Sequence, residues 1–508
     1  MSFRRRIIKR LRRAIFRILA SSSALSETAV KRVLIPIWSR TFSAVKNSVP
    51  HGLPVFFVPY NTPACRIQHA AFAGLLERLG VQTMVLQPND LEISREKWRS
   101  PSTAEADRPF NTFSEAIDWL IDQSAGEEDI ARGLIDEFVR HAPVSAFFTP
   151  SVSSEFISQS LRRIDGAKKI VDRGAGFVFA DSAYLRTRTV IAEARRQGKP
   201  VWILNPDRRF LLMNDDVNEI FPRTDLRALV NQLDDNPRLA SEVAAYLELR
   251  FRGRSHSDLD SSSAFSGRDD LPPDLRNRKV LMLHAFRDAS NLPTTQATGW
   301  RKTIFNTYFE WVDFCLAEIA QRPQDWAIRQ HPSSRFYPGD DEILEALLDK
   351  HKLTHSLPRV EKISTATLLG NRIPLYTHSG TIALESAVWG YKSHTCSNVF
   401  PEEIAHFSRS EAEYSRTLRL SYDEAAPTVE AVSSRAAGLV LYQRVTPSGV
   451  GIYPPQGQPT KSSKMSFRIS ILRQTLALSR RFFSLQARLE ARQVATQMAT
   501  SLAAKPSL

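Results

Sequence analysis

Short apolar runs alternate with amphipathic segments along the chain, and this alternation restricts the possible folds more than any other feature. Strand-like runs at 53–61 and 81–86 flank a helical segment at 70–79, and the same order recurs between residues 176 and 206. A strand, a helix and a second strand in this order usually form a right-handed unit with parallel strands. The sequence therefore predicts an α/β fold whose sheets carry helices on both faces.

The second half of the chain shows the same alternation. We expect strands at 279–284, 326–329 and 373–376, and helices at 304–319, 342–351, 382–388 and 428–445. In the first half we expect a further strand at 144–149, and helices within 224–252 that close this half. Residues 255–274 are rich in Ser and Asp and end in Pro-Pro, which is typical of a linker.

The predicted organisation therefore has two Rossmann-like domains between basic ends. Its parts are a basic segment at 1–46, an N-terminal domain at 47–254, a linker at 255–275, a C-terminal domain at 276–445, and a linker with a basic helix at 446–508.

The net charge of +14 resides in the two ends of the chain. Residues 1–46 contain 12 Lys or Arg and one acidic residue, and residues 461–508 contain nine and one, so the ends carry +11 and +8. The remaining chain therefore carries −5. A nucleic-acid-binding domain would carry its basic residues on the fold itself, so this distribution argues against that class.

The three cysteines, Cys65, Cys315 and Cys396, lie far apart and form no CxxC pair. This spacing argues against a disulfide framework or a cysteine-based zinc site, and it fits a reducing cytoplasm.

The first 20 residues form a basic amphipathic pattern. Phe3, Ile7, Leu11, Ile15 and Ile18 share one helical face, and the other faces are basic. The apolar runs are too short for a membrane span, and Arg17 interrupts any signal-peptide core. We expect this helix to lie on an anionic membrane surface. The contacts would come from Arg4, Arg5, Arg6, Lys9 and Arg10. A transit peptide, or a helix packed on its own domain, would show a similar pattern.

Residues 376–392 read as a strand, a tight turn and a helix. The turn contains Ser379, Gly380 and Thr381, and Glu385 follows Thr381 by one helical turn. Small residues before a helix start allow a phosphate to approach free backbone N–H groups. An ordinary helix capped by a serine is the alternative.

Other polar residues also fall at strand ends. Arg287 and Asp288 follow one expected strand of the second half, and Arg329 and His331 follow the next. Parallel strands place such residues at one edge of the sheet, where Arg, His and hydroxyl groups together suit a phosphate ligand. A single His after a strand is otherwise more often structural. In the first half, the corresponding residues are Tyr60, Asn61, Asp181 and Ser182.

A family resemblance rests on the order of short motifs. The motifs W-A-I-R-Q-H-P, I-S-T-A-T-L-L and S-G-T-I-A-L-E resemble, in this order, the nucleotide-sugar-binding half of GT-B glycosyltransferases of bacterial capsule or surface polysaccharide biosynthesis. The F-N-T-Y-F-E-W helix after H-A-F-R-D-A is similar to that group too. S-G-T-x-x-L-E resembles lipid-A-disaccharide synthase, and the His-Pro motif resembles sialyl- and Kdo-transferases that use CMP-sugars. The resemblance covers about 276–400 and, loosely, 181–206.

The resemblance implies a GT-B fold, in which two Rossmann-like domains face a cleft, with donor binding in the second domain. Arg329 and His331 would contact the donor phosphates, and Glu385 the ribose or sugar. Ser379, Gly380 and Thr381 would form the phosphate turn, with Ser364 and Thr365 near the base. The chain departs from the family at His378, which would add a donor group, and at Tyr391-Lys392-Ser393, where Gly-Lys-Pro is common.

The implied reaction is a metal-independent, inverting sugar transfer without a cofactor, from a CMP- or UDP-sugar to a polysaccharide or lipid-linked glycan. Asp288 or Asp181 would accept the proton of the acceptor hydroxyl. The enzyme would work in the cytoplasm at the inner face of the membrane. A nucleotide-sugar epimerase on the same fold, or a non-catalytic polysaccharide assembly or export protein, are the alternatives.

Overall fold

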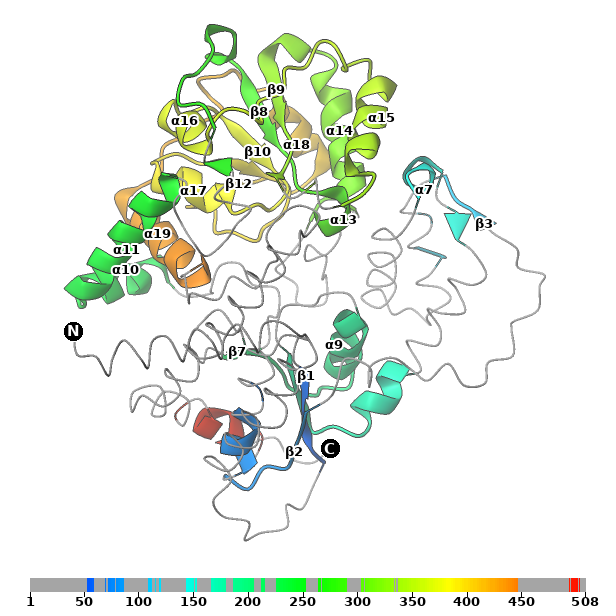
Figure 1. The fold of residues 1–508 in the computed structure, drawn as a ribbon, viewed down its shortest axis with the longest axis vertical. Helices are drawn as coiled ribbons and strands as arrows, with labels where there is room; N and C mark the ends of the chain where they lie inside the picture. The colour runs from blue at the N-terminus through cyan, green and yellow to red at the C-terminus, as the bar shows by residue number, and fades with distance from the viewer. Residues whose placement is uncertain are drawn as a thin grey trace, which may run out of the picture. The chain divides into compact units, whose positions relative to one another are not determined.

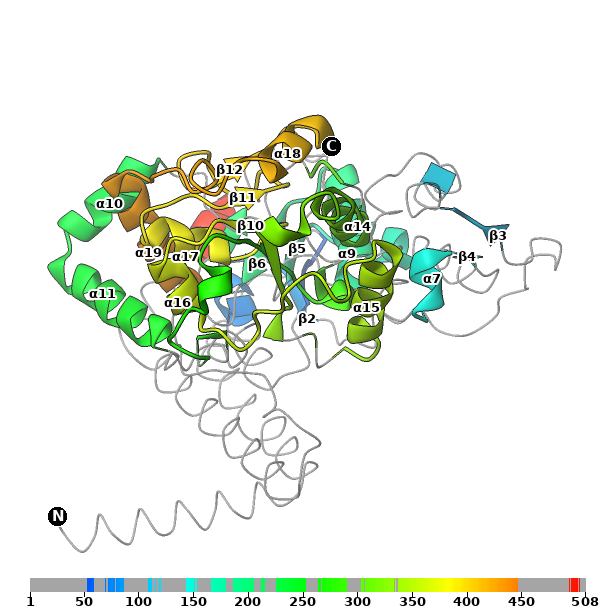
Figure 2. The same cartoon turned by 90° about the horizontal axis from the view of Figure 1, so that it is seen from above.

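The structure is a computed structural model in which the chain forms two compact units (Figures 1 and 2). It describes residues 53–58, 143–149, 151–152, 166–179, 186–204, 212–214, 225–252, 264–289 and 303–445, with short gaps, and parts of 69–85, 108–119 and 493–502. The first unit comprises 1–96, 164–217 and 447–508, and the second comprises 97–163 and 218–446.

The second unit is built on a parallel sheet of five strands in the order β12-β11-β10-β8-β9. The strands are β8 (Lys279–Met282), β9 (Trp326–Arg329), β10 (Leu375–Thr377), β11 (His394–Thr395) and β12 (His406–Phe407). The strands β8, β9 and β10 are short and almost entirely buried, as expected for a parallel sheet covered on both faces. Register pairs Leu281 of β8 with Tyr376 on one side and with Ile328 on the other.

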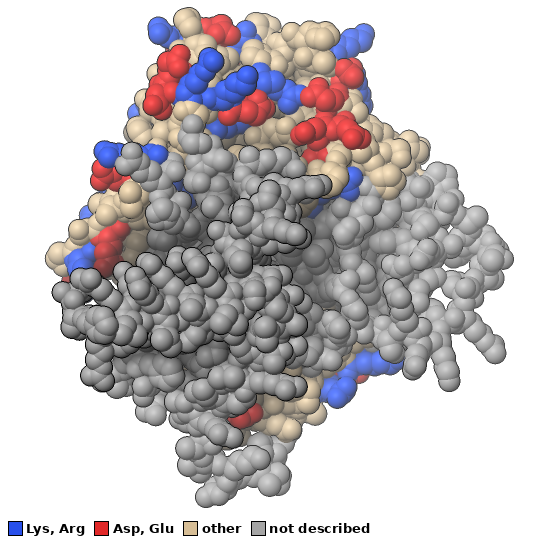
Figure 3. Space-filling model, in the orientation of Figure 1, with Lys and Arg blue, Asp and Glu red and all other residues tan. Residues whose placement is uncertain are grey.

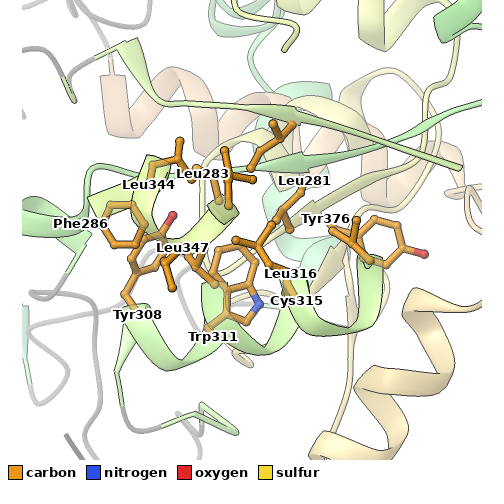
Figure 4. Close-up of a cluster of buried hydrophobic side chains, with 14 of the residues drawn as sticks. Leu281, Leu283, Phe286, Tyr308, Trp311, Cys315, Leu316, Leu344, Leu347 and Tyr376 are labelled. Atoms are coloured by element: carbon orange, nitrogen blue, oxygen red, sulfur yellow. The ribbon is translucent and has the colours of Figure 1, made fainter. Parts of the chain in front are cut away.

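Helices cover both faces of this sheet. One face packs against α14 (Tyr308–Ile319), α15 (Asp340–Lys350) and α18 (Glu411–Leu418), around a core that includes Leu281, Trp311 and Tyr376 (Figure 4). The other face packs against α16 (Thr365–Gly370) and the start of α17 (Ile382–Val388). Alternate residues of one strand point to opposite faces, so Val280 and Leu281 belong to different cores.

Three further helices form a separate layer of the second unit. They are α10 (Leu226–Asp234), α11 (Pro237–Phe251) and α19 (Ala431–Val445), which pack together and against α17. The sequence places α10 and α11 in the N-terminal half, with a boundary at residue 254. In the structure they share a core with α17 and α19, so the observed packing differs from that boundary.

The predicted linker is partly folded onto the second sheet. Phe265, Leu271 and Leu275 pack with Ile363 and Leu369. These apolar side chains lie among Ser and Asp residues, and their burial stabilises this part of the segment. The described part of 255–275 is therefore packed on the second sheet and belongs to the folded second unit.

The first unit contains a second five-stranded sheet in the order β2-β1-β5-β6-β7. Its strands are β1 (Val55–Val58), β2 (Thr83–Val85), β5 (Gly176–Phe179), β6 (Val201–Leu204) and β7 (Leu212–Asn214). All neighbours pair in parallel except β6 and β7, which are antiparallel. Helix α9 (Arg186–Arg196) packs on one face, and residues 72–76 with 495–498 pack on the other. Both units thus have the predicted α/β, Rossmann-like architecture.

Several elements differ from the sequence-based expectation. The strand predicted at 144–149 is wrong: residues 145–148 form helix α7 (Ser145–Phe148), with Phe147 packed against Phe309. A short apolar run does not distinguish a strand from a helix, and here tertiary packing decides. The antiparallel pair of β3 (Arg108–Pro109) and β4 (Ser151–Val152), and the strands β11 and β12, lack a clear sequence signal.

Among the helices that the structure describes, none combines the length and apolar character needed to cross a bilayer. The N-terminal basic helix predicted from the sequence, with Arg4, Arg5, Arg6, Lys9 and Arg10, lies outside the described residues, and of the predicted C-terminal one only parts of 493–502 are described.

Candidate functional site

A pocket lies at the carboxyl ends of β8, β9 and β10, within the second unit. The pocket is open to solvent, and its empty volume, which includes the open mouth, is about 510 Å³. Residues directly after the three strands, the first turn of α17, α11 and residues 264–265 form its walls. The polar residues that line it are Arg250, His284, Arg329, Gln330, His331, Thr365, Thr377, Thr381 and Glu385.

Arg329 supplies a buried positive charge to this pocket. It ends β9, and only 3% of its surface is exposed. Its Nη2 donates to the carbonyl oxygen of Ala264 at 2.8 Å, whereas no partner among the described residues accepts a hydrogen bond from its buried Nη1. Burial lowers the pKa of Arg329 to about 10, although Glu361 and Glu385 oppose the shift, so the side chain is charged at neutral pH. This guanidinium is suited to an anionic ligand.

Ser364 and Thr365, which the resemblance places near the base, fasten residues 264–265 to the pocket wall. Ser364 is the N-cap of α16, and its Oγ donates to the carbonyl of Phe265 at 3.0 Å. Thr365 Oγ1 donates to the carbonyl of Ala264 at 2.9 Å, the same oxygen that Arg329 contacts. Only Thr365 of the two lines the pocket.

Glu385 forms a buried ion pair with Arg250 of α11. Both Nη2 and Nε of Arg250 donate to Glu385 Oε1, the second at 3.1 Å, and Nη1 donates to the hydroxyl of Tyr246 at 3.2 Å. The guanidinium also lies 5.5 Å from the ring centre of Phe265. Glu385, the carboxylate predicted to contact ribose or sugar, is therefore paired with Arg250 in the pocket, and this ion pair offsets the cost of burying its charge.

Two imidazoles lie beside the turn that precedes α17. The rings of His284 and His331 are stacked with centres 5.6 Å apart. A methyl group on Gly380 would lie 3.0 Å from His284 Nε2 and 2.9 Å from Thr377 Oγ1, so the absence of a side chain at residue 380 permits this close approach. Thr377 Oγ1 also accepts a hydrogen bond from the N–H of Gly380 at 3.3 Å.

The start of α17 differs from both sequence-based interpretations. Thr381 is its N-cap, without a side-chain capping bond, so a serine cap is not present. The helix has only seven residues, so its dipole is a small contribution to anion binding. Thr381 and Ile382 line the pocket. The N–H groups of Ala383 and Leu384 already donate to the carbonyls of Gly380 and Thr381, at 3.0 and 2.9 Å. Buried side-chain charge is the stronger feature of the site.

The backbone around His284 is held on two sides. Its N–H donates to the hydroxyl of Tyr308 at 2.6 Å, and this hydroxyl donates to the His284 carbonyl at 3.2 Å. The buried carboxylate of Asp340 accepts from the N–H groups of Phe286 and Arg287 at 2.8 and 3.2 Å. Burial raises the pKa of Asp340 to about 6, and these hydrogen bonds oppose the shift.

Besides Ser364, three further predicted site residues do not line the pocket. His378 is buried against the rings of Tyr308 and Trp311, with ring-centre distances of 5.7 and 5.5 Å. Burial and the neighbouring His284 lower the pKa of His378 to about 3, so it is a neutral core residue. The Oγ of the buried Ser379 lies 3.3 Å from His378 Nδ1. Arg287 lies over the ring of Phe147, 5.7 Å from its centre.

The two predicted proton acceptors cannot be placed against this pocket. Asp181 lies outside the described residues, with Tyr60, Asn61 and Ser182. Asp288 belongs to the short helix α13 (Phe286–Ala289), but its side chain lies outside the described part of the structure. Among the side chains that the structure describes, no group of three His, Cys, Asp or Glu is arranged to hold a metal ion.

Sequence reasoning assigned no role to His284, Arg250 or Asp340. The strand-end rule could have found His284, because it is the second residue after β8. Arg250 and Asp340 have no comparable signal. Arg250 lies 135 residues before Glu385, and only the packing of α11 on α17 brings them together.

Comparisons with known proteins add little to this geometry. No protein-family model matches the sequence, and no curated protein matches it. A crystal structure from Listeria monocytogenes, assigned as a UDP-N-acetylglucosamine 2-epimerase, is similar with a TM-score of 0.25 and 14% sequence identity. The match covers 77% of this chain and 95% of that chain. A TM-score of this size is too low to bear on the fold or function of this chain.

Proposed function

We propose that the pocket of the second unit binds a nucleotide-sugar and that the protein is a GT-B-type glycosyltransferase. The sugar would pass from a CMP- or UDP-sugar to a cell-surface or capsule polysaccharide acceptor, without a metal ion. The observation that carries this proposal is the buried Arg329, whose Nη1 has no partner among the described residues, at the carboxyl edge of a parallel sheet. Ligands of open α/β sheets bind at this edge.

The pocket groups have chemistry that suits the departing nucleotide. Arg329 supplies a fixed positive charge, and the imidazoles of His284 and His331 supply further hydrogen-bonding nitrogens. When the bond between sugar and phosphate breaks, negative charge develops on the phosphate oxygen, and such groups stabilise it. The acceptor hydroxyl must lose its proton, for which Asp288 and Asp181 are the proposed bases.

A nucleotide-sugar epimerase is the second candidate, and the stacked His284–His331 pair favours it. Epimerisation requires groups that remove and return a proton at one sugar carbon, and two adjacent imidazoles can do so. The two activities differ in one measurement. An epimerase incorporates deuterium from D2O into the sugar without an acceptor, whereas a transferase forms a glycosidic product only when an acceptor is present.

The cellular setting is also part of the proposal. The basic ends would hold the protein on the inner face of the cytoplasmic membrane, beside a lipid-linked or growing glycan. The +11 charge of residues 1–46 and the amphipathic pattern of the first 20 residues support this placement.

Nucleotide binding tests the proposal directly. CMP-, UDP- and GDP-sugars are added separately, and the melting temperature is measured. We expect at least one to raise it, because a ligand that binds only the folded state stabilises the protein. Arg329→Met should weaken binding by about tenfold to a hundredfold, since a charged hydrogen bond contributes about 1.5–3 kcal/mol. The exposed Arg322→Met is the matched control. No stabilisation by any nucleotide-sugar would contradict both enzymatic functions.

A further inference from the structure

His284 occupies a position that the sugar-transfer proposal does not by itself require. It lines the pocket from the end of β8, beside Gly380 and Thr377 of the β10 turn and facing His331 from the end of β9. Three adjacent strands therefore converge on one imidazole. Its backbone is held by Tyr308, so the ring starts from a fixed main-chain position.

The charges around this ring determine how it can titrate. His331 faces it from β9, Arg329 lies in the same wall, and Arg250 is paired with Glu385 from α11 and α17. His378, from the β10 turn, is a neutral core residue, and Asp340 of α15 contacts the backbone of α13. Among the described residues that line the pocket, the buried charges are thus the cation Arg329 and the internally neutral Arg250–Glu385 pair.

Two stacked imidazoles beside a cation do not readily carry two protons. A positive charge on one ring disfavours a second on the other at this distance, and Arg329 disfavours both. A phosphate reverses this balance, because it attracts a protonated imidazole as a hydrogen-bond donor. Binding of phosphate and binding of one proton should therefore be coupled.

Resting on the proposed nucleotide site, we propose that His284 is a phosphate-contact residue and that it shares with His331 one proton taken up from solvent when the phosphate binds. The protonated imidazole donates N–H to a phosphate oxygen. Affinity for the nucleotide is then highest at a pH where imidazole is protonated. It falls as the pH rises above about 6.5, the ordinary pKa of imidazole.

Calorimetric titration of the full chain tests this coupling. CMP, UDP and GDP are titrated separately at pH 7 in two buffers of different ionisation enthalpy, which reports the protons taken up. We expect net uptake of up to one proton, and affinity about tenfold weaker at pH 8 than at pH 6. The nucleosides cytidine, uridine and guanosine lack phosphate and should show no uptake.

Variants separate His284 from its neighbours. His284→Gln should abolish proton uptake and flatten the pH dependence. His331→Gln should change the uptake, because one imidazole is left to carry the proton, while the exposed His355→Gln should behave as wild type. Gly380→Ala should reduce uptake without removing an imidazole, because its methyl group would displace the His284 ring. Thermal melting of each variant confirms that it is folded.

The outcomes separate the two proposals. If the wild type binds none of the nucleotides, the proposed function and this inference both fail. If it binds one without proton uptake, or if His284→Gln retains uptake, only the role of His284 is overturned.

Discussion

The buried pair of Arg250 and Glu385 is the single-residue feature with the largest energetic consequence. Their side chains are 2% and 5% exposed, so either charge alone would be buried without compensation. Removing one partner of a buried ion pair costs about 3–5 kcal/mol, whereas replacing both by apolar residues of similar size is often nearly neutral. Arg250 also contacts Tyr246 and Phe265, which adds packing to the charge interaction.

We therefore predict that Arg250→Met lowers the free energy of unfolding by about 3–5 kcal/mol. The double variant Arg250→Met/Glu385→Leu should recover most of this loss, because no unpaired charge remains. Urea unfolding at neutral pH measures both. The exposed pair Arg238–Glu242 is the control, and Arg238→Ala should cost less than about 0.5 kcal/mol. A loss below about 1 kcal/mol for Arg250→Met would contradict the assignment.

Some of the site follows from the sequence, because strand ends carry positional information. Arg329, His331 and Thr381 lie in one pocket, although 52 residues separate the first from the last, since β9, β8 and β10 are adjacent in the sheet. The direction of a side chain has no such signal. His378 is next to a pocket residue in the chain, yet its ring is buried against Trp311. Tertiary packing determines this difference.

At the scale of elements, the strands of the second sheet bury two histidines near their ends. His378 follows β10, and His394 begins β11, with its ring stacked on Tyr376 and its Nε2 2.9 Å from the carbonyl of Ala425. Burial lowers the pKa of both to about 3 from an ordinary value of 6.5. The folded state therefore excludes protons that the unfolded state binds below pH 6.5, and stability falls as the pH decreases.

The titration of Asp340 changes the stability of the fold in the opposite direction. Its pKa is raised to about 6 from 3.8, so the folded state binds its proton more tightly and gains stability as the pH falls through this range. The stability gained from the raised pKa of Asp340 offsets only part of the stability lost through the lowered pKa values of His378 and His394. We predict that the free energy of unfolding decreases by about 2–3 kcal/mol between pH 7 and pH 5.

Urea unfolding at the two pH values measures this decrease. His394→Gln can still donate to the Ala425 carbonyl, and it should remove about 2 kcal/mol of the pH dependence. His355→Gln, at an exposed position, should leave the dependence unchanged. Equal pH dependence in His394→Gln and wild type would show that His394 is not excluded from protonation in the fold.

Longer elements, whose apolar residues recur at a regular spacing, were predictable from the sequence, whereas very short elements were not. The amphipathic pattern at 304–319 corresponds to α14, and the expected strand at 326–329 is β9. By contrast, β11 and β12 have only two residues each and are defined by pairing with their neighbours. The helix α7 forms in an apolar run with no period to identify it.

At the scale of the whole molecule, the chain passes between the two units several times. Ala495 and Met498, near the C-terminus, pack with Val55 and Phe57 of β1, whereas 218–446 lies in the other unit. Sequence composition gives no indication of such a return, because it depends on contacts across more than 400 residues. Apolar side chains of the C-terminal segment are thus buried in the core of the first unit.

At the scale of the whole molecule, the positive charge of the chain is distributed unevenly between its ends and its folded units. On the face drawn in Figure 3, Lys and Arg side chains of the second unit are interspersed with Asp and Glu, and no uniformly basic surface is visible there. The excess positive charge resides in the chain ends. If the ends hold the protein on a membrane, position should matter more than net charge, because the apolar face of an amphipathic helix inserts beside its basic residues.

We predict that the full chain binds anionic vesicles and that exchanging five N-terminal basic residues for Gln releases it. The residues are Arg4, Arg5, Arg6, Lys9 and Arg10. Binding should also weaken at high salt, since each basic residue near the surface contributes about 1 kcal/mol that salt screens. Co-sedimentation with phosphatidylserine-containing vesicles measures the bound fraction.

A control variant with the same loss of charge separates position from net charge. Five exposed residues of the second unit are exchanged for Gln: Arg227, Arg276, Arg322, Lys352 and Lys362. This variant should remain on the vesicles, because the basic amphipathic segment predicted at residues 1–20 is unchanged. Equal release of both variants would mean that net charge alone drives binding. Full retention of the N-terminal variant would mean that residues 1–20 are not the contact.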